Sequence, residues 1–192
     1  IEIQGKKLWE VKPGIVKDLI PLCKKLASEG SVLLENDGVL PFEKGTKIAL
    51  FGRIQETYIK SGTGSGGSVK VEKAPCILDS FIENDVFSID EELVGVYKKW
   101  IAEHPFDKGD GWTEPWHQEE MPLSDDLVKE VSLRNDVAVI IIGRTAGEDK
   151  DNSYAPGSYC LTSDEISMIS KVSNAFDKTV VVLNVGNLID LS

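Results

Sequence analysis

The chain has 192 residues, of which 41% are hydrophobic and 28% are charged. This length and composition are typical of one sizeable globular domain and exclude an extensively disordered chain. The formal net charge of −11 disfavours binding to nucleic acid or to an anionic membrane surface, because like charges repel.

The first half of the chain predicts one long helix, one strand and a polar loop. Residues 13–29 have helical periodicity, with Pro21 as a kink or break and with an apolar stripe formed by Ile15, Leu19, Leu22 and Leu26. Residues 32–37 are compatible with a short extended segment or with a continuation of this helix. KIALFG at 47–52 predicts a buried strand, and a long polar loop from Arg53 to Ala74 follows it.

The second half alternates helices with two further buried strands. We expect helices at 76–84, 89–104, 124–133 and 162–176, the last two capped by Ser124 and by Thr162 or Ser163 with Glu165. DVAVIIIG at 136–143 and TVVVLNVG at 179–186 predict strands. The segment 105–124 lacks periodicity and is rich in Gly, Pro and Trp, which indicates a long excursion.

The alternation of short Val/Ile/Leu runs with helices predicts an α/β fold. Strands that are apolar on both faces imply a mostly parallel sheet covered by helices on both faces, and we expect residues 1–192 to form a single domain. Ligands of such sheets lie outside the carboxyl ends of the strands. The candidate loops are therefore those that follow Phe51, Ile142 and Leu183.

The glycine-rich loop SGTGSGGS at 61–68 matches GxGxxG at Gly62, Gly64 and Gly67. A dinucleotide site needs these glycines in a tight turn between a strand and a helix, and neither is adjacent here. The absence of a following GK[ST] also excludes a P-loop. The two favoured interpretations are a glycine-rich loop that lines a ligand site and a plain surface loop, and nucleotide binding is the third alternative.

The loop GRTAGEDKDN at 143–152 places Glu148 beside Asp149 and Asp151. Neighbouring carboxylates raise the pKa of one another, which suits a general acid, whereas Arg144 and Lys150 oppose this effect. The net direction of the pKa shift is therefore open at this point. A solvated charged loop is the alternative to a catalytic one.

Other side chains offer less chemistry. Trp112 and Trp116 are candidates for an apolar wall against a sugar ring or for packing within the excursion. Three widely spaced cysteines and two histidines do not match a disulfide framework, a structural zinc site or a nucleophile–histidine pair. We therefore expect no cofactor and no metal.

Several phrases together resemble the C-terminal α/β-sandwich domain of glycoside hydrolase family 3, the β-glucosidase-like enzymes. These phrases are ASEGSVLLENDGVLPF at 27–42, KIALFG followed by YIKSGTGSGGS, DVAVIIIGRTAGEDKDN, and LTSDEISMISKVSNAF followed by TVVVLNVGN. They occur in the family's order from about residue 14 to about residue 190, and the third matches an R-x-x-GEGxDR-type loop.

The resemblance implies a part of a retaining, exo-acting β-glycosidase, with β-glucosidase as the first expectation and a β-linked glucoside or oligosaccharide as substrate. It implies that Glu148 is the general acid/base and that the nucleophile, an Asp, lies on a separate (β/α)8 barrel domain that this chain does not contain. Arg144 and Asp151 match the loop motif, and Gly62, Gly64 and Gly66 match the glycine-rich loop near the sugar. The loop departs from the motif at Asp149, where Gly is usual, and at Asn152, where Arg is usual.

Two further expectations concern the extent of the protein. The chain begins at Ile1 without Met and ends at Ser192 just after a strand, so we expect an excerpt with an incomplete sheet that is inactive alone. The order of sandwich and barrel stays open. No signal-peptide pattern opens the segment, which favours the cytoplasm. A non-catalytic carbohydrate-binding or domain-docking module is the alternative function.

Overall fold

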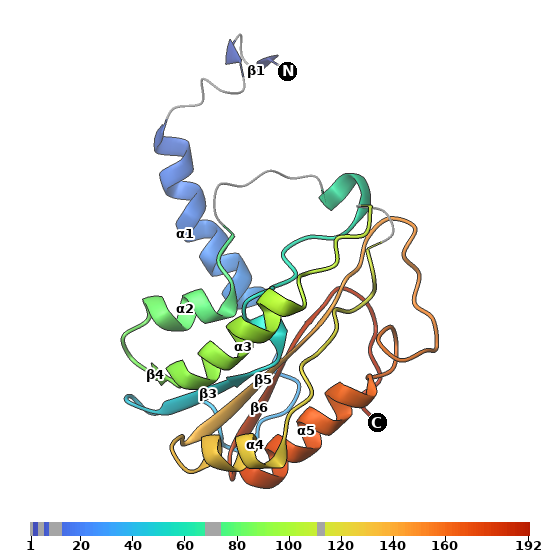
Figure 1. Cartoon of the computed structure of the whole chain (residues 1–192). Coiled ribbons are helices and arrows are strands. Elements are labelled where there is room, and N and C mark those ends of the chain that lie inside the picture. Colours follow the sequence, from blue (N-terminus) through green and yellow to red (C-terminus); the bar gives the residue numbers. More distant parts are fainter. Residues whose placement is uncertain (1, 4–5, 8–12, 68–73, 111–113) are drawn as a thin grey trace. The chain divides into compact units, whose positions relative to one another are not determined.

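The computed structural model describes residues 2–3, 6–7, 13–67, 74–110 and 114–192, which form two compact units, 1–40 and 41–192 (Figure 1). In the first unit, strands β1 (Glu2–Ile3) and β2 (Lys6–Lys7) pair antiparallel. Helix α1 spans Pro13–Gly30 and contains Pro21, so the predicted break does not occur. Because α1 ends at Gly30, residues 32–37 do not continue it.

The second unit is built on a four-stranded parallel sheet with the strand order β4-β3-β5-β6. Its strands are β3 (Lys47–Phe51), β4 (Ser88–Ile89), β5 (Val137–Arg144) and β6 (Thr179–Val185). The sequence did not indicate β4, because a two-residue strand is too short to show a period. The expected helix at 89–104 wrongly included Ile89, which is the second residue of β4.

The described residues of this unit form four α-helices and two short 3-10 turns. The helices are α2 (Ile77–Glu83), α3 (Glu91–Glu103), α4 (Asp125–Ser132) and α5 (Ser163–Ala175), and the turns are η2 (Arg53–Gln55) and η3 (Gly64–Gly67). Side chains of Cys76, Asp90, Ser124 and Thr162 cap the helices by accepting backbone N–H groups. In the part of the chain that the structure describes, no helix is both long and apolar enough to span a bilayer.

The strand order decides which face each helix covers. β4 and β5 pair with opposite edges of β3, so the crossover from β3 to β4 and the crossover from β4 to β5 run in opposite directions. Right-handed crossovers then place α2 on one face and α3, α4 and α5 on the other. The predicted fold class, a parallel sheet with helices on both faces, is confirmed.

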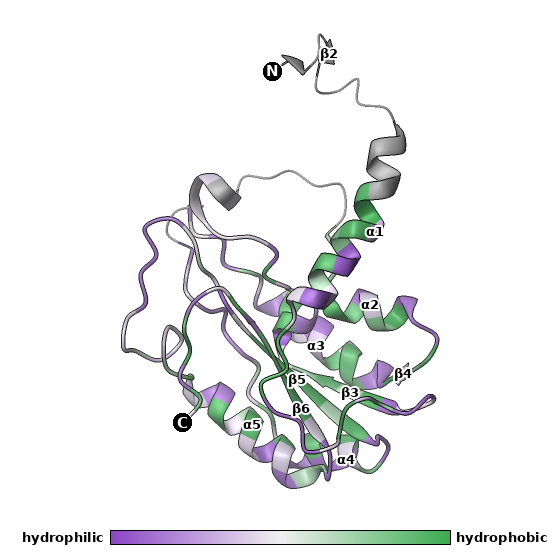
Figure 2. Cartoon of the chain, turned by 180° about the vertical axis from the view of Figure 1, so that it is seen from behind, coloured by the Kyte–Doolittle hydropathy of each residue, from purple (hydrophilic) through white to green (hydrophobic). Residues whose placement is uncertain are grey.

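The main core lies between the sheet and α3, α4 and α5. It joins Phe51 and Ile140 of the sheet to Leu93, Val131 and Met168 of the helices. All eight residues of β5 are buried, and the strands are the apolar centre of the unit in Figure 2. A strand paired on both edges and covered on both faces needs a continuous apolar run, which is what the sequence showed.

A buried carboxyl group holds the chain where it leaves β3. The Glu120 carboxyl accepts the backbone N–H of Arg53 at 3.2 and 3.0 Å and that of Met121 at 2.8 Å. Burial raises the pKa of Glu120 to about 7, and Glu165 adds to this effect, while the backbone hydrogen bonds oppose it. Glu120 thus joins the turn after β3 to the excursion between α3 and α4.

The titration of Glu120 predicts a pH-dependent stability. Between its ordinary pKa of 4.5 and about 7 the folded protein keeps a proton that the unfolded chain has released, so this contribution is complete below pH 4.5 and is lost as the pH rises through 7. The difference between these two pKa values corresponds to a loss of roughly 3 kcal/mol of unfolding free energy across this pH range. Glu120→Gln cannot ionise, so we expect it to gain stability over the wild type as the pH rises from 5 to 8.

Urea denaturation at pH 5 and pH 8 measures this effect as the difference between the variant and the wild type. That difference cancels the opposite contribution of His117, whose pKa is lowered mainly by burial in both proteins. Glu103→Gln, at an exposed position, serves as the control and should follow the wild type. Parallel pH profiles for Glu120→Gln and the wild type would contradict the prediction.

Candidate functional site

The candidate site lies where the strand order reverses. From β3 the chain first crosses to β4 on one side and later returns to β5 on the other side of β3. The connections that follow β3 and β5 therefore leave toward opposite faces, and in sheets of this kind ligands bind beyond the carboxyl ends of such strands. The glycine-rich loop follows β3 and the Glu148 loop follows β5, so the topology brings the two predicted loops together.

Backbone hydrogen bonds join these two loops directly. Thr63 and Gly147 form an isolated parallel bridge. The Thr63 N–H donates to the Ala146 carbonyl at 2.8 Å, and the Glu148 N–H donates to the Thr63 carbonyl at 3.4 Å. Thr63 is buried although it lies in a surface loop. The loops thus extend the β3–β5 contact beyond the sheet.

Three glycines permit this close approach. A Cβ on Gly62 would lie 2.7 Å from the Ala146 carbonyl oxygen, and one on Gly147 would lie 2.4 Å from the Thr63 nitrogen. A Cβ on Gly67 would lie 1.9 Å from the Gly62 carbonyl oxygen. Real Cβ atoms do not come this close to backbone atoms. Gly62 and Gly147 are therefore required for the contact between the two loops, and Gly67 is required for the turn within the glycine-rich loop.

The other predicted glycines shape the same loop. Gly64 has a φ of 78°, in the left-handed region that glycine adopts without steric cost. Gly64 and Gly66 both belong to the η3 turn. This geometry differs from a dinucleotide fingerprint, in which the glycines lead into the N-terminus of an α-helix.

Glu148 is fully exposed on this pair of loops, and Ser65 of the glycine-rich loop binds its carboxylate. The Ser65 hydroxyl donates to Glu148 Oε2 at 2.8 Å, and the Ser65 backbone N–H donates to the same oxygen at 3.1 Å. These bonds, the hydroxyl first, lower the pKa of Glu148 below its ordinary value. The open question about the direction of this shift is therefore answered by Ser65, a residue that the neighbouring charges did not reveal.

The two residues that depart from the motif both have defined positions in the loop after Glu148. Asp149 has a φ of 55°, a left-handed conformation that Asp tolerates better than most residues and that glycine adopts freely. The Asn152 amide donates to the Leu188 carbonyl at 2.7 Å. Asp151 lies between them and is exposed.

A third segment, residues 114–117 of the excursion, supports the loop from the side. The Thr145 N–H donates to the Trp116 carbonyl at 2.8 Å, and the Thr145 hydroxyl donates to the Glu114 carboxylate at 3.1 Å. The Lys150 ammonium group donates to the Glu114 carbonyl and lies 5.0 Å from the centroid of the Trp116 ring. The charged group of Lys150 thus lies over the face of the Trp116 ring. Trp112, the other predicted aromatic wall residue, lies outside the described residues.

Arg144 supports the loop from inside the domain. It is 1% exposed, and its guanidinium group forms a two-pronged ion pair with Glu165 at 2.6 and 2.7 Å. Its remaining hydrogen bonds go to the carbonyl groups of Gly143, Ser158 and Cys160. Glu165 also caps α5 through Thr162, so Arg144 joins the end of β5 to the start of α5. The guanidinium group is thus buried and bonded within the domain, and the predicted place of Arg144 in the substrate site stays a prediction.

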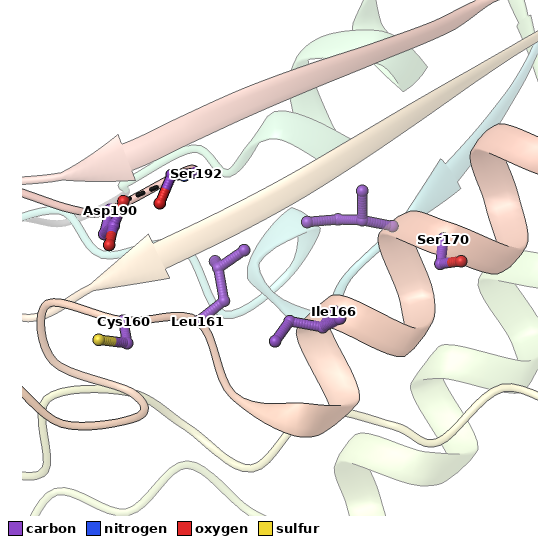
Figure 3. A pocket seen from close by; sticks show the side chains of 7 residues that line it. Cys160, Leu161, Ile166, Ser170, Asp190 and Ser192 are labelled. Carbon is purple, nitrogen blue, oxygen red and sulfur yellow. Dashed lines mark hydrogen bonds between the residues drawn. The ribbon is translucent and has the colours of Figure 1, made fainter.

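An apolar hollow lies elsewhere, between α5 and the C-terminal segment (Figure 3). Leu161, Ile166 and Ile169 line it, and the Ser192 N–H donates to Asp190 at its rim. Neither Glu148 nor the glycine-rich loop contributes to this hollow.

The contact between the loops predicts a specific effect of Gly147→Ala. The added Cβ meets Thr63, so we expect the bridge to open and the unfolding free energy to fall by about 1–3 kcal/mol. Hydrogen exchange at the Thr63 amide should become faster. Gly45→Ala is the matched control, because Gly45 also has a positive φ but no heavy atom within 4 Å of the added Cβ. Retained protection of Thr63 in Gly147→Ala would show that the bridge does not depend on this glycine.

Comparison with known proteins gives consistent relatives. Residues 31–192 match the glycosyl hydrolase family 3 C-terminal domain. The β-glucosidase of Ruminococcus albus is 53% identical over 165 residues, and β-glucosidase A of Butyrivibrio fibrisolvens is 31% identical over 196 residues. These alignments cover 85% and 89% of this chain but only 17% and 23% of the relatives, so the chain spans less than a quarter of their length.

Solved structures agree with the sequence relatives. A β-glucosidase from Paenibacillus barengoltzii superposes with a TM-score of 0.85 at 45% identity, covering 88% of this chain and 18% of that one. β-Glucosidase 3B of Thermotoga neapolitana, in complex with α-D-glucose, superposes with a TM-score of 0.79 at 32% identity. This superposition covers 91% of the present chain and 25% of the Thermotoga chain. The ordered motifs, the parallel sheet and the matched residues lead to one conclusion: the chain belongs to the glycosyl hydrolase family 3 C-terminal domains.

Proposed function

We propose that the protein containing this chain is a retaining, exo-acting β-glucosidase and that this domain supplies Glu148 as its general acid/base. The observation that carries the proposal is the position of Glu148. It is an exposed carboxylate on two interlocked loops at the point where the strand order reverses. The family membership and the β-glucosidase relatives support the reaction class.

The reaction needs a second carboxyl group about 5–5.5 Å from the first, as in other retaining glycosidases. We expect it to be an Asp on a (β/α)8 barrel domain of the same protein. In the first step this Asp bonds to the anomeric carbon, the glycosidic C–O bond breaks, and Glu148 gives its proton to the leaving oxygen. In the second step water attacks the anomeric carbon, Glu148 takes the water proton, and the bond to the Asp breaks.

The lowered pKa of Glu148 is consistent with an active site of which this chain supplies only one of the two carboxyl groups. A general acid near neutral pH must hold its proton, whereas here the carboxylate is exposed and accepts two hydrogen bonds from Ser65. Docking against a barrel would remove water and bring a second carboxylate close, and both effects raise the pKa of a carboxyl group. We therefore expect no hydrolysis by this chain alone.

The glycone is expected to be glucose. The Thermotoga relative has been solved with α-D-glucose, and the surface of this chain is acidic, which favours an uncharged sugar over an anionic substrate. A non-catalytic sugar-binding or docking module is the competing function, and it would leave Glu148 without effect on turnover.

Glu148→Ala in the complete enzyme tests the proposal. On cellobiose we expect kcat/KM to fall by roughly 10²–10⁴-fold, the range of general acid catalysis. On an aryl glucoside with a good leaving group kcat/KM should change little, because that oxygen departs without a proton. Azide should then raise kcat and yield β-glucosyl azide, since azide attacks the glycosyl-enzyme without a general base.

Asp149→Asn is the matched control. It removes a neighbouring charge from the same loop, and Asn adopts the left-handed region as readily as Asp. We expect it to keep the ratio of the two kcat/KM values near that of the wild type. If Glu148→Ala hydrolysed cellobiose at the wild-type rate, the acid/base assignment would be wrong and the docking-module function would be favoured.

A further inference from the structure

The contact between Ser65 and Glu148 is asymmetric. Both Ser65 donors, the hydroxyl and the backbone N–H, bind Oε2 of the carboxylate. Among the residues that the structure describes, no group is hydrogen-bonded to Oε1. One oxygen is thus held by the glycine-rich loop, and the other is available to a substrate.

The position of Ser65 is fixed by the contacts around it. On one side Thr63 is bridged to Gly147, directly before Glu148. On the other side Gly67 closes the η3 turn against the Gly62 carbonyl, where a Cβ would lie 1.9 Å from the oxygen. The donors of Ser65 and the carboxylate of Glu148 therefore belong to one local framework. A side chain held in this way loses little further freedom when it reaches a transition state.

From this geometry we infer that Ser65 is a positioning residue for the acid/base. It holds Oε2 of Glu148, so that Oε1 is the oxygen that exchanges the proton with the leaving group and with water. This inference rests on the proposed role of Glu148. Nothing in the loop motif around Glu148 points to Ser65, which lies 83 residues earlier in the chain.

The hydrogen bonds also change in strength during the reaction. A donor binds a carboxylate more strongly than a neutral carboxylic acid, because the bond is charge-assisted. When Glu148 gives up its proton in the first step, the two Ser65 bonds strengthen as the negative charge develops. In this first step Ser65 therefore stabilises the transition state more than the ground state, which is the requirement for a catalytic effect.

The effect should depend on the leaving group. Substrates with poor leaving groups need full proton transfer and use the whole stabilisation, whereas activated aryl glucosides need little. A residue that only maintained the fold would slow both classes of substrate equally. The ratio of the two rates thus separates positioning from general structural support.

The first experiment measures the pair in this chain, without any catalysis. Carboxyl carbon NMR follows the titration of Glu148 in the wild type, Ser65→Ala and Ser61→Ala. We expect Ser65→Ala to raise the pKa of Glu148, because the carboxylate loses its strongest donor, and Ser61→Ala to leave it unchanged. Charged and titratable groups on the supporting segments, namely Asp149, Lys150, Asp151, Glu114 and His117, are the same in all three proteins.

The second experiment uses the complete enzyme. Ser65→Ala should lower kcat/KM roughly tenfold on cellobiose and spare an activated aryl glucoside. It should also move the alkaline limb of the pH profile to higher pH. Ser65→Thr, which keeps the hydroxyl, should restore both readouts, and Ser61→Ala should match the wild type.

The outcomes distinguish this inference from the proposed function. An unchanged Glu148 titration in Ser65→Ala, or equal losses on both substrates, would overturn the positioning role while Glu148→Ala still reported an acid/base. Full activity of Glu148→Ala would overturn the catalytic role of both residues. A raised pKa together with selective loss on cellobiose would support the inference.

Discussion

The close backbone contact between residues 62–63 and 146–147 is the constraint on which the candidate site depends. It exists because β3 and β5 are adjacent and parallel, so that both chains leave the sheet at the same edge. It persists beyond the strands because Gly62 and Gly147 carry no Cβ. A carboxylate on one loop and a serine on the other thereby become neighbours, although neither strand positions them directly.

Buried polar groups behind the loops convert this contact into a defined geometry. Arg144 and Glu165 join β5 to the start of α5, and Glu120 joins the turn after β3 to the excursion. These bonds act at the carboxyl ends of β3 and β5, where the chain leaves the sheet. Such groups are costly to bury, and their hydrogen bonds are directional, so they specify one path for the chain where apolar packing would accept several.

The site also shows how the loop tolerates its departures from the family motif. Asp149 occupies a backbone conformation that explains the usual glycine at that position, at a steric cost that an Asp can bear. The usual Arg is replaced by Asn152, which binds the Leu188 carbonyl, and Lys150 supplies a cation that contacts Trp116. Asn152 and Lys150 thus both anchor the loop, and Glu148 is exposed on it.

Hydrophobic periodicity, caps and glycine positions by themselves determined the parallel α/β fold, three of the four strands of the sheet and the approximate bounds of the helices. The rule that ligands lie beyond the carboxyl ends of strands, together with the family resemblance, selected Glu148. These features are local along the chain, and a single sequence records them. Only the tertiary structure decided that Ser65 binds Glu148, that Arg144 turns inward to Glu165, and that the pKa of Glu148 falls. Each of these depends on a contact between residues 21 to 83 positions apart, whose distance is set by strand order and crossover direction and not by neighbouring residues.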